Sequence, residues 1–499
     1  MRNPRFDNDQ EMNKRGAEQV ILLGALLLFF GILWYVSPTG IYPDSGSYIS
    51  LQAGREPLYP TFLALFRKLY GEGDRITWLA SSGQALSEEF LPEFLENKPL
   101  RTAAFVQNLL AALSCWFLTN AVWRVFRPGK SLKLLMACCT LIPYLLTPVA
   151  SSSGMVLTNA ILTEGLAFPL NSFFTGCMIL ALLEKDKKIR HYGMAFLVSF
   201  LLAVTRNQML VIFAVWCVAV LFEIVRSRQW RVIFLLALAV VLFLAGRRTV
   251  TELYNYAADK SYVGADTGSY NLLTTVLYLS EPSDAEAIRE PEYRELFLTL
   301  HEQMDGGEMT STFAPAGVLN RAYHYEEYYD VIGFQVQQPI LFTYVRDQGA
   351  SKEEELTAVV KVASDLCGEL LPVLFGEFAY NYFATVCSGL TRSISASGTI
   401  MGVYSLFAYF IAVILMVYLY YHNRQSKAAL LMLFALFMIC ANVFGTAVMI
   451  MCLSRYMIYH TALFYIAGLM ELMELWQLWR SKEINGKEIE RNGLSESEI

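Results

Sequence analysis

The sequence predicts an all-α polytopic membrane protein, and three observations support this. Of the 499 residues, 55% are hydrophobic and only 17% are charged, with a mean hydropathy of +0.38; soluble globular chains are more polar. Apolar runs of the length that crosses about 30 Å of hydrocarbon recur along the chain. Lys and Arg gather in alternate connections between these runs, as in multi-pass proteins. We expect about ten transmembrane helices, interfacial helices beside them and one long extracytoplasmic segment.

The N-terminal tail, residues 1–19, is basic and precedes the first apolar run at 20–36. Arg2, Arg5, Lys14 and Arg15 favour a cytoplasmic location for this tail. No small-residue cleavage pattern follows the run, so we interpret it as a retained anchor rather than a removed signal peptide.

The chain then enters a first outer loop, 37–101, which begins near YPDSGSY. Two stretches of the loop, PLYPTFLALFRKLYG and SEEFLPEFLENK, carry aromatic and aliphatic residues at helical spacing. Neither is long or apolar enough to cross the membrane, so both are expected to be interfacial helices. They would form a shelf beside Asp44.

Six further crossings complete a predicted transmembrane module at 20–246. They lie near 102–122, 134–148 and 157–183, in a hairpin at 192–222, and at 232–245. The hairpin is interrupted by TRNQ and has basic flanks on both sides, which places Arg206 at its outer tip. Each arm is short, which indicates a thinned or hydrated region near Arg206, or helices that stop inside a cavity. A simple snorkelling arginine is the alternative.

Residues 247–399 are expected to be extracytoplasmic. The polar part, 247–369, has tyrosine-rich and acidic stretches and the length of a modest domain. The following stretch, LLPVLFGEFAYNYFATVCSGL, is interpreted as an interfacial or re-entrant helix, with a true span as the alternative. Cys367 and Cys387 would pair only if this segment faces an oxidising compartment, and their spacing leaves that open.

Three last spans, near 400–421, 428–451 and 457–476, form the predicted region 400–479, and the charged residues 480–499 are expected to be a disordered cytoplasmic tail. Both termini are then cytoplasmic. Asp44, Glu164, Arg206 and Arg455 all fall at the outer face.

Four isolated ionisable residues at span ends on one face indicate a shared polar cavity. The planar fork of arginine matches phosphate oxygens, and a carboxylate accepts the proton of an attacking hydroxyl. Two acids and two arginines therefore suit displacement of a phosphate from a sugar carbon. The alternative is that each residue is solvated separately, with 43–46 forming an ordinary polar turn.

The order of these motifs resembles the GT-C superfamily of integral-membrane glycosyltransferases, particularly its protein-mannosyltransferase-like and aminoarabinose-transferase-like branch. The matching features are Asp44 with GREPLYP after it, LTE at the start of the fourth span, TRNQ in a short hairpin, and SRYMIYH before the last span. The resemblance covers most of 20–222 and the segment around Arg455. The long segment 247–369 matches nothing in that family.

The resemblance implies roles for the matching residues. Asp44 would act as the catalytic base, and Glu164 would orient a substrate hydroxyl or Asp44 itself. Arg206, and Arg455 with Tyr456, would face the donor phosphate.

Arg55 and His460 are secondary candidates for substrate or phosphate binding. The first-loop acid is single, where several branches have an acid pair, and residue 207 is Asn where Pro is frequent. These departures leave a divalent metal and the branch open.

We therefore expect an enzyme that moves a sugar from a polyprenyl-phosphate donor to a hydroxyl acceptor, with inversion at the anomeric carbon. The acceptor would be a cell-envelope glycan, a lipid or a protein, and the active site would face the outside of a bacterial plasma membrane. Nothing indicates nucleic acid. The alternatives are a secondary transporter of a polar or anionic solute, which should show similar halves, and a lipid-linked glycan polymerase or ligase.

Overall fold

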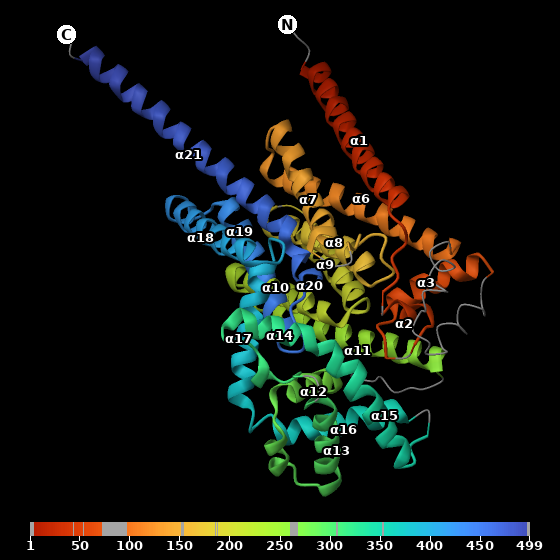
Figure 1. Cartoon of the computed structure of the whole chain (residues 1–499). Coiled ribbons are helices and arrows are strands. Elements are labelled where there is room, and N and C mark those ends of the chain that lie inside the picture. Colours follow the sequence, from red (N-terminus) through yellow and green to blue (C-terminus); the bar gives the residue numbers. More distant parts are fainter. Residues whose placement is uncertain are drawn as a thin grey trace.

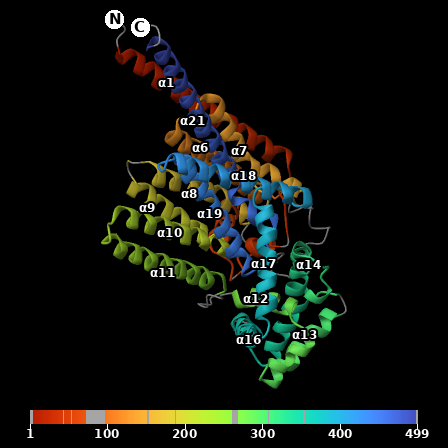
Figure 2. The same cartoon turned by 90° about the vertical axis from the view of Figure 1, so that its left-hand side faces the viewer.

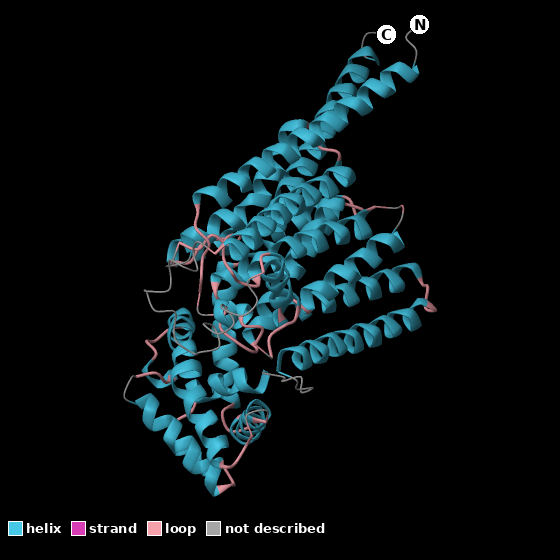
Figure 3. Ribbon diagram, turned by 90° about the vertical axis from the view of Figure 1, so that its right-hand side faces the viewer, coloured by secondary structure: helices cyan, strands magenta, loops and turns pink. Residues whose placement is uncertain are grey.

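The computed structural model describes residues 4–42, 44–52, 54–71, 97–150, 154–184, 186, 188–259, 268–305, 308–351 and 354–496. Within these ranges the elements are helical, apart from an isolated parallel bridge between Gly40 and Ala160 (Figure 1, Figure 3). Two hydrophobic cores organise the helices, one in a bundle of apolar helices and one in a smaller polar unit.

Within the part of the chain that the structure describes, the apolar bundle contains eight helical stretches that are long and apolar enough to cross a membrane. They are Gly16–Val36, Lys98–Phe126, Lys130–Pro148, Glu164–Leu183, Asn207–Ser227, Val232–Ala258, Thr399–His422 and Lys427–Ala447. The chain is therefore an integral, multi-pass α-helical membrane protein. Both termini lie at the end of the bundle that is remote from the polar unit (Figure 1, Figure 2).

The bundle helices cover the apolar runs of the sequence, and several of them extend beyond the expected spans. They are α1 (Pro4–Val36), α6 (Lys98–Phe126), α7 (Lys130–Ala150), α8 (Glu164–Leu183), α9 (Lys188–Ala203), α10 (Leu210–Ser227), α11 (Val232–Asp259), α18 (Thr399–His422), α19 (Lys427–Ala447) and α21 (Thr461–Glu496). α9 has 16 residues, and neither α9 nor α21 belongs to the eight stretches. A total of ten spans therefore stays a prediction, although both helices pack within the bundle.

The fourth helix differs from the expectation, because α8 begins at Glu164 and not near residue 157. The preceding residues turn back to pair with the chain that leaves α1. Gly40 donates a backbone hydrogen bond to Asn159 at 2.9 Å and accepts one from Ile161 at 2.9 Å. The Asn159 side chain also donates to the Ser37 carbonyl at 2.8 Å. This pairing replaces the first helical turns and leaves Glu164 at the helix N-terminus.

The expected hairpin around Arg206 is present. α9 and α10 pack against each other, and η1 (Asn207–Met209) joins them. Arg206 itself is extended, with φ −157° and ψ 129°. The Trp216 indole donates to the Tyr192 carbonyl at 3.0 Å and holds the two arms together.

Short helices follow α1. They are α2 (Ser45–Ile49) and α3 (Leu58–Leu69). α3 confirms the first expected amphipathic helix: Tyr59 and Leu63 are buried, while Leu65 and Leu69 are exposed. The second expected helix, SEEFLPEFLENK, falls almost entirely in 72–96, outside the described residues.

The polar helical unit has its own hydrophobic core, as a modest domain should. It comprises α12 (Gly268–Leu279), η2 (Pro282–Ala287), α13 (Pro291–Asp305), η3 (Ser311–Phe313), α14 (Val318–Val331), α15 (Gln338–Asp347) and α16 (Glu355–Leu370). A π-helical segment, η4 (Ile332–Gln337), joins α14 to α15 without a break. The unit extends from one end of the bundle (Figure 2).

α17 (Phe375–Arg392) returns the chain from the polar helical unit to the bundle and contacts α14, α18 and α19. It covers the stretch that was expected to be interfacial or re-entrant, and it is not one of the eight membrane-length stretches. Cys367 and Cys387 are both free thiols, so the disulfide that the sequence left open is not formed.

The last part of the chain corrects one expectation. After α20 (Ser454–Met457) and η5 (Ile458–His460), α21 continues as a helix to Glu496. The tail expected to be disordered is therefore helical over 480–496. Its composition is rich in Lys and Glu, which are good helix formers, and this preference outweighed the charge content on which the expectation rested.

Candidate functional site

A buried carboxylate with two arginines lies at the N-terminus of α8. The Glu164 side chain is 2% exposed, and its Oε1 lies 2.7 Å from Arg206 Nη1 and 3.6 Å from Arg455 Nε. Since two guanidinium groups face one carboxylate, this buried triad carries one net positive charge. A net positive charge at this end of the bundle is suited to an anionic group such as phosphate.

The Tyr456 ring contacts both arginines. The guanidinium carbon of Arg206 is 4.2 Å from the centre of its ring, and that of Arg455 is 4.9 Å from it. The Tyr456 hydroxyl also accepts a hydrogen bond from Arg455 Nη2 at 2.9 Å. The aromatic face lets two like charges approach, because its negative quadrupole attracts both.

Gln208 fixes the position of Arg206. Its Oε1 accepts from Arg206 Nε at 2.9 Å. Its Nε2 donates to Asn442 Oδ1 at 3.0 Å and to Thr446 Oγ1 at 2.7 Å, both on α19. The TRNQ turn is thus attached to α19 through the side-chain amide of Gln208, which the sequence did not indicate as a functional residue.

Asp44 and Arg55 form a second ion pair, 2.8 Å apart and about one third exposed on each side. A local turn does exist here, since Ser47 donates from its backbone N–H to the Asp44 carbonyl at 3.2 Å. However, the Asp44 carboxylate makes no capping hydrogen bond to α2. The carboxylate is therefore free of the turn and is held by Arg55 instead.

The loop that carries Arg55 is braced by the C-terminal part of α11. Gly54 adopts φ 83°, which favours glycine, and its N–H donates to Asn255 Oδ1 at 3.0 Å. The Tyr254 hydroxyl donates to the Gln52 carbonyl at 3.1 Å. α11 extends 14 residues beyond the expected end of that span at 245, and this extension supplies both contacts.

The same loop also contacts the Arg206 turn. Glu56 Oε1 accepts from the backbone N–H of Asn207 at 3.0 Å, and Arg247 donates to Asn207 Oδ1 at 2.6 Å. Glu56 follows Arg55 in the chain, and Asn207 follows Arg206. The Glu56–Asn207 bond therefore fixes the positions of Arg55 and Arg206 relative to each other.

Tyr48 lies between the exposed pair and the buried triad. Its side chain is buried, and the charges of Arg55, Asp44 and Glu164 all act on it. Burial is the main cause that raises the pKa of Tyr48 well above its usual value, so the phenol stays neutral. Arg55 lies 5.0 Å from the centre of its ring. Tyr48 thus packs beside the Asp44–Arg55 pair, and the Glu56–Asn207 bond joins the loop of this pair to the Arg206 turn.

His460 is not part of this site. It is 1% exposed, and its Nδ1 lies 3.4 Å from Asn171 Nδ2 of α8. The neighbouring Tyr459 is the residue that approaches the triad: its ring stacks on Phe168 at 4.0 Å, and the charges of Arg206 and Glu164 act on its hydroxyl. The 3-10 turn η5 directs Tyr459 and His460 into different surroundings, which the linear motif could not show.

The described residues contain no group of three or more His, Cys, Asp or Glu side chains with the arrangement of a metal site. Asp44 and Glu164 each engage arginine. We therefore derive no chemical step through a divalent metal.

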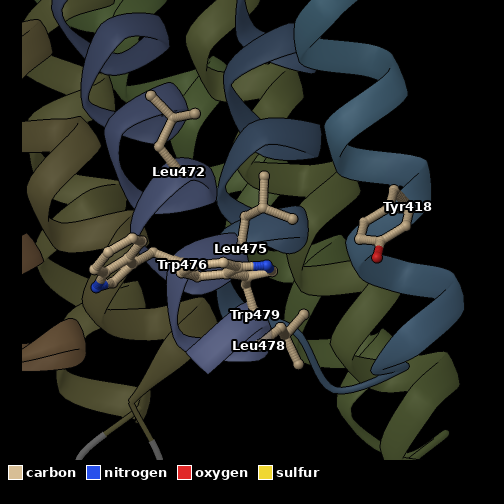
Figure 4. A pocket seen from close by; sticks show the side chains of 6 residues that line it. All are labelled: Tyr418, Leu472, Leu475, Trp476, Leu478 and Trp479. Atoms are coloured by element: carbon tan, nitrogen blue, oxygen red, sulfur yellow. The ribbon is translucent and has the colours of Figure 1, made fainter. Parts of the chain in front are cut away.

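An apolar pocket lies away from the charged site, between α18 and the later part of α21. Figure 4 shows its lining residues, Tyr418, Leu472, Leu475, Trp476, Leu478 and Trp479. None of these side chains is charged. Tryptophan and tyrosine are enriched at the membrane–water interface, so this pocket fits lipid contact better than chemistry.

Comparison with known proteins adds no assignment: no protein-family model, no curated protein and no solved structure matches this chain. The class defined by the fold and the site is thus an integral multi-pass membrane protein with a charged site at the end of the bundle that adjoins the polar helical unit.

Proposed function

We propose that this protein is a membrane glycosyltransferase of the GT-C type, which moves a sugar from a polyprenyl-phosphate donor to a hydroxyl acceptor at the extracytoplasmic face. The observation that carries the proposal is the juxtaposition of a triad with one net positive charge, Glu164 with Arg206 and Arg455, and a partly exposed carboxylate, Asp44. The first suits a leaving phosphate and the second suits a base.

The reaction is a single displacement. Asp44 takes the proton of the acceptor hydroxyl, and the acceptor oxygen forms a bond to the anomeric carbon. The bond between that carbon and the phosphate oxygen breaks, and its electron pair leaves with the polyprenyl phosphate. Attack from the face opposite the phosphate inverts the anomeric centre.

The arginines stabilise the charge that develops on the leaving phosphate. Arg206 and Arg455 present guanidinium groups beside Tyr456, and this arrangement is fixed before substrate binds, which removes a reorganisation cost. Arg55 Nη2 donates to Asp44 Oδ1 at 2.8 Å and orients this carboxylate until the acceptor displaces it.

Glu164 takes a role different from the one expected from the sequence. At 2% exposure it has no accessible face for an acceptor, and it engages both arginines and accepts a hydrogen bond from Thr163 at 3.1 Å. We assign it as a positioning residue for the two guanidinium groups rather than as a group that touches the acceptor.

The decisive experiment is transfer from a radiolabelled polyprenyl-phosphate sugar pool in membranes that contain the wild type or Asp44→Asn, at matched protein levels. We expect a loss of about a hundredfold or more, since the general base is removed. Glu252→Gln is the control, because this glutamate pairs with the exposed Arg248 on α11. Unchanged transfer by Asp44→Asn would refute the catalytic role of Asp44. A wild type without transfer that instead moves a charged solute across vesicles would favour the transporter alternative.

A further inference from the structure

A buried glutamate lies on α21, the last helix of the bundle, about 15 Å along that helix from Thr461 at 1.5 Å per residue. The Glu471 side chain is 0% exposed, and neither of its carboxyl oxygens has a hydrogen-bond partner among the residues that the structure describes. α21 packs on α7, α18 and α19, so protein encloses this side chain. Buried polar groups in native proteins are nearly always hydrogen-bonded, and an exception indicates a ligand.

Glu474, one helical turn further along α21, is a carboxyl group with a partner. Its Oε2 accepts a hydrogen bond from the backbone N–H of Ala428 at 3.2 Å. The Ser426 hydroxyl oxygen accepts from the next N–H, that of Ala429, at 3.0 Å. Two N–H groups at the start of α19 therefore already have acceptors, and neither of them bonds to Glu471.

Basic side chains on the elements that pack against α21 are engaged elsewhere. On α7 and α19 the three lysines contact other groups: Lys130 pairs with Glu18, Lys133 lies over the Trp123 ring, and Lys427 donates to the Val125 carbonyl. Of the histidines, His422 at the end of α18 is exposed, and His460 of η5 lies beside Asn171. The other titratable residues of α7, α18 and α19 are cysteines and tyrosines. No basic side chain is thus paired with Glu471 in the part of the chain that the structure describes.

The surroundings of Glu471 favour its neutral form. An ionised carboxylate that leaves water without a partner has a large desolvation penalty, whereas the protonated acid carries no net charge. The neighbouring Glu474, at i+3 on the same helix, adds no compensating charge, since it is also an acid. A hard cation such as Ca²⁺ or Mg²⁺ takes about six or more oxygen ligands, while a proton needs only the carboxyl group itself.

An apolar pocket lies along the same face of α21. Leu475 and Leu478, two of its lining residues, follow Glu471 at i+4 and i+7, which places all three on one face of the helix (Figure 4). The pocket has a volume of about 540 Å³ and no charged lining side chain. It therefore offers an apolar reagent a route toward Glu471 that an ionic reagent cannot use.

We propose that Glu471 is a proton-binding site inside the bundle, which holds its proton at neutral pH and is open to modification by an apolar carbodiimide. In that reaction the acid proton moves to one carbodiimide nitrogen, and the carboxyl oxygen forms a bond to the central carbon as one carbon–nitrogen π bond breaks. The acyl group then migrates from oxygen to nitrogen and leaves a stable N-acylurea. The bound proton is part of the packing of α21 on its neighbours, because an ionised Glu471 would have no partner there.

The first test labels the purified full chain with dicyclohexylcarbodiimide at about pH 7 and locates the adduct by mass spectrometry of peptides. We expect Glu471 to carry one reagent molecule. Glu252 is the internal control, because it pairs with Arg248 on the exposed surface of α11 and should stay unlabelled. A water-soluble carbodiimide with an amine nucleophile should give the reverse pattern.

The second test is infrared difference spectroscopy of the wild type against Glu471→Gln, which replaces the acid by a neutral side chain of nearly equal size. The difference should contain the carbonyl band of one protonated carboxylic acid, and the same difference for Glu252→Gln should lack it. Absence of the acid band overturns the proposal, as does labelling of Glu471 by both carbodiimides. Protection of Glu471 by Na⁺ or K⁺ would show that a cation is bound instead. Neither measurement needs a sugar donor, so the result stands apart from the proposed function.

Discussion

The two charged groups of the site differ in burial although they share one framework. The Glu164 carboxylate is 2% exposed and faces two arginines, whereas Asp44 and Arg55 are each about one third exposed and face one another. Buried charges are stable only while they stay paired, and exposed pairs exchange partners at little cost. The first group is therefore a fixed source of positive charge, and the second is the part that can release a carboxylate to a substrate.

The largest expected effect comes from breaking the buried triad. Glu164→Gln leaves Arg206 and Arg455 without a counter-charge in the protein interior, and we expect the free energy of unfolding to fall by about 3–5 kcal/mol. Asp44→Asn should change it by less than about 1 kcal/mol, because that pair is solvated. Thermal unfolding of both variants in detergent measures the difference.

A second variant sharpens this result. In the double change Glu164→Gln with Arg455→Gln, one of the two unpaired charges is removed as well, and part of the stability should return. If Glu164→Gln and Asp44→Asn have the same free energy of unfolding, the ion pairs of Glu164 with Arg206 and Arg455 stabilise the protein no more than the exposed Asp44–Arg55 pair does.

A smaller effect is expected from the residue after Glu164. A Cβ on Gly165 would approach the Gln107 side chain to 2.5 Å, and Gln107 donates to the carbonyls of Thr158 and Ala160 at 2.9 and 3.1 Å. Gly165→Ala must therefore displace either Gln107 or the start of α8, at a cost of about 1–3 kcal/mol. Thermal unfolding again reports the change.

Gly193→Ala on α9 is the matched control, because a Cβ there meets nothing within 4 Å. It should be neutral or slightly stabilising, since alanine favours a helix over glycine. If both alanine variants behave alike, the close packing of α8 on α6 at Gly165 is not what fixes Glu164.

The sequence predicted the helices well, because each membrane crossing leaves a long apolar signal of its own. It also predicted that Asp44, Glu164, Arg206 and Arg455 share one end of the bundle, since alternation of the chain direction requires it. The sequence did not predict the side-chain contacts between helices. Gln208 carries no charge and gave no signal, although it lies within the TRNQ turn and connects that turn to α19.

Asp330, at the end of α14, was missed for a different reason. It lies in a segment with many acids and tyrosines, where no periodic pattern distinguishes one carboxylate from another. Its position depends on how the polar helical unit packs on the bundle through 450–453, and this packing leaves no pattern in the sequence. His460 is the opposite case. It was a candidate because it belongs to the SRYMIYH motif, but the 3-10 turn η5 directs its side chain into the interior.

The smallest expected effect concerns the pH dependence of stability at the exposed end of α14. Partial desolvation by the surrounding protein, although the side chain is exposed, and then the negative charges of Asp44 and Glu326 raise the pKa of Asp330, while Arg455 lowers it. A carboxyl whose pKa is raised in the folded state binds its proton more tightly there than in the unfolded chain, so its ionisation costs stability above the folded pKa and costs nothing below the ordinary value of about 4. Asp330→Asn should therefore be more stable than the wild type at about pH 8, by less than about 1 kcal/mol because the side chain is solvated.

The difference should disappear as the pH is lowered to about 4, where both proteins carry a neutral side chain at this position. Melting temperatures of Asp330→Asn and the wild type at several pH values give the curve, with Glu327→Gln as the control that should run parallel to the wild type. A variant that is less stable at about pH 8 would show that the attraction of Asp330 to Arg455 exceeds its repulsion from Asp44.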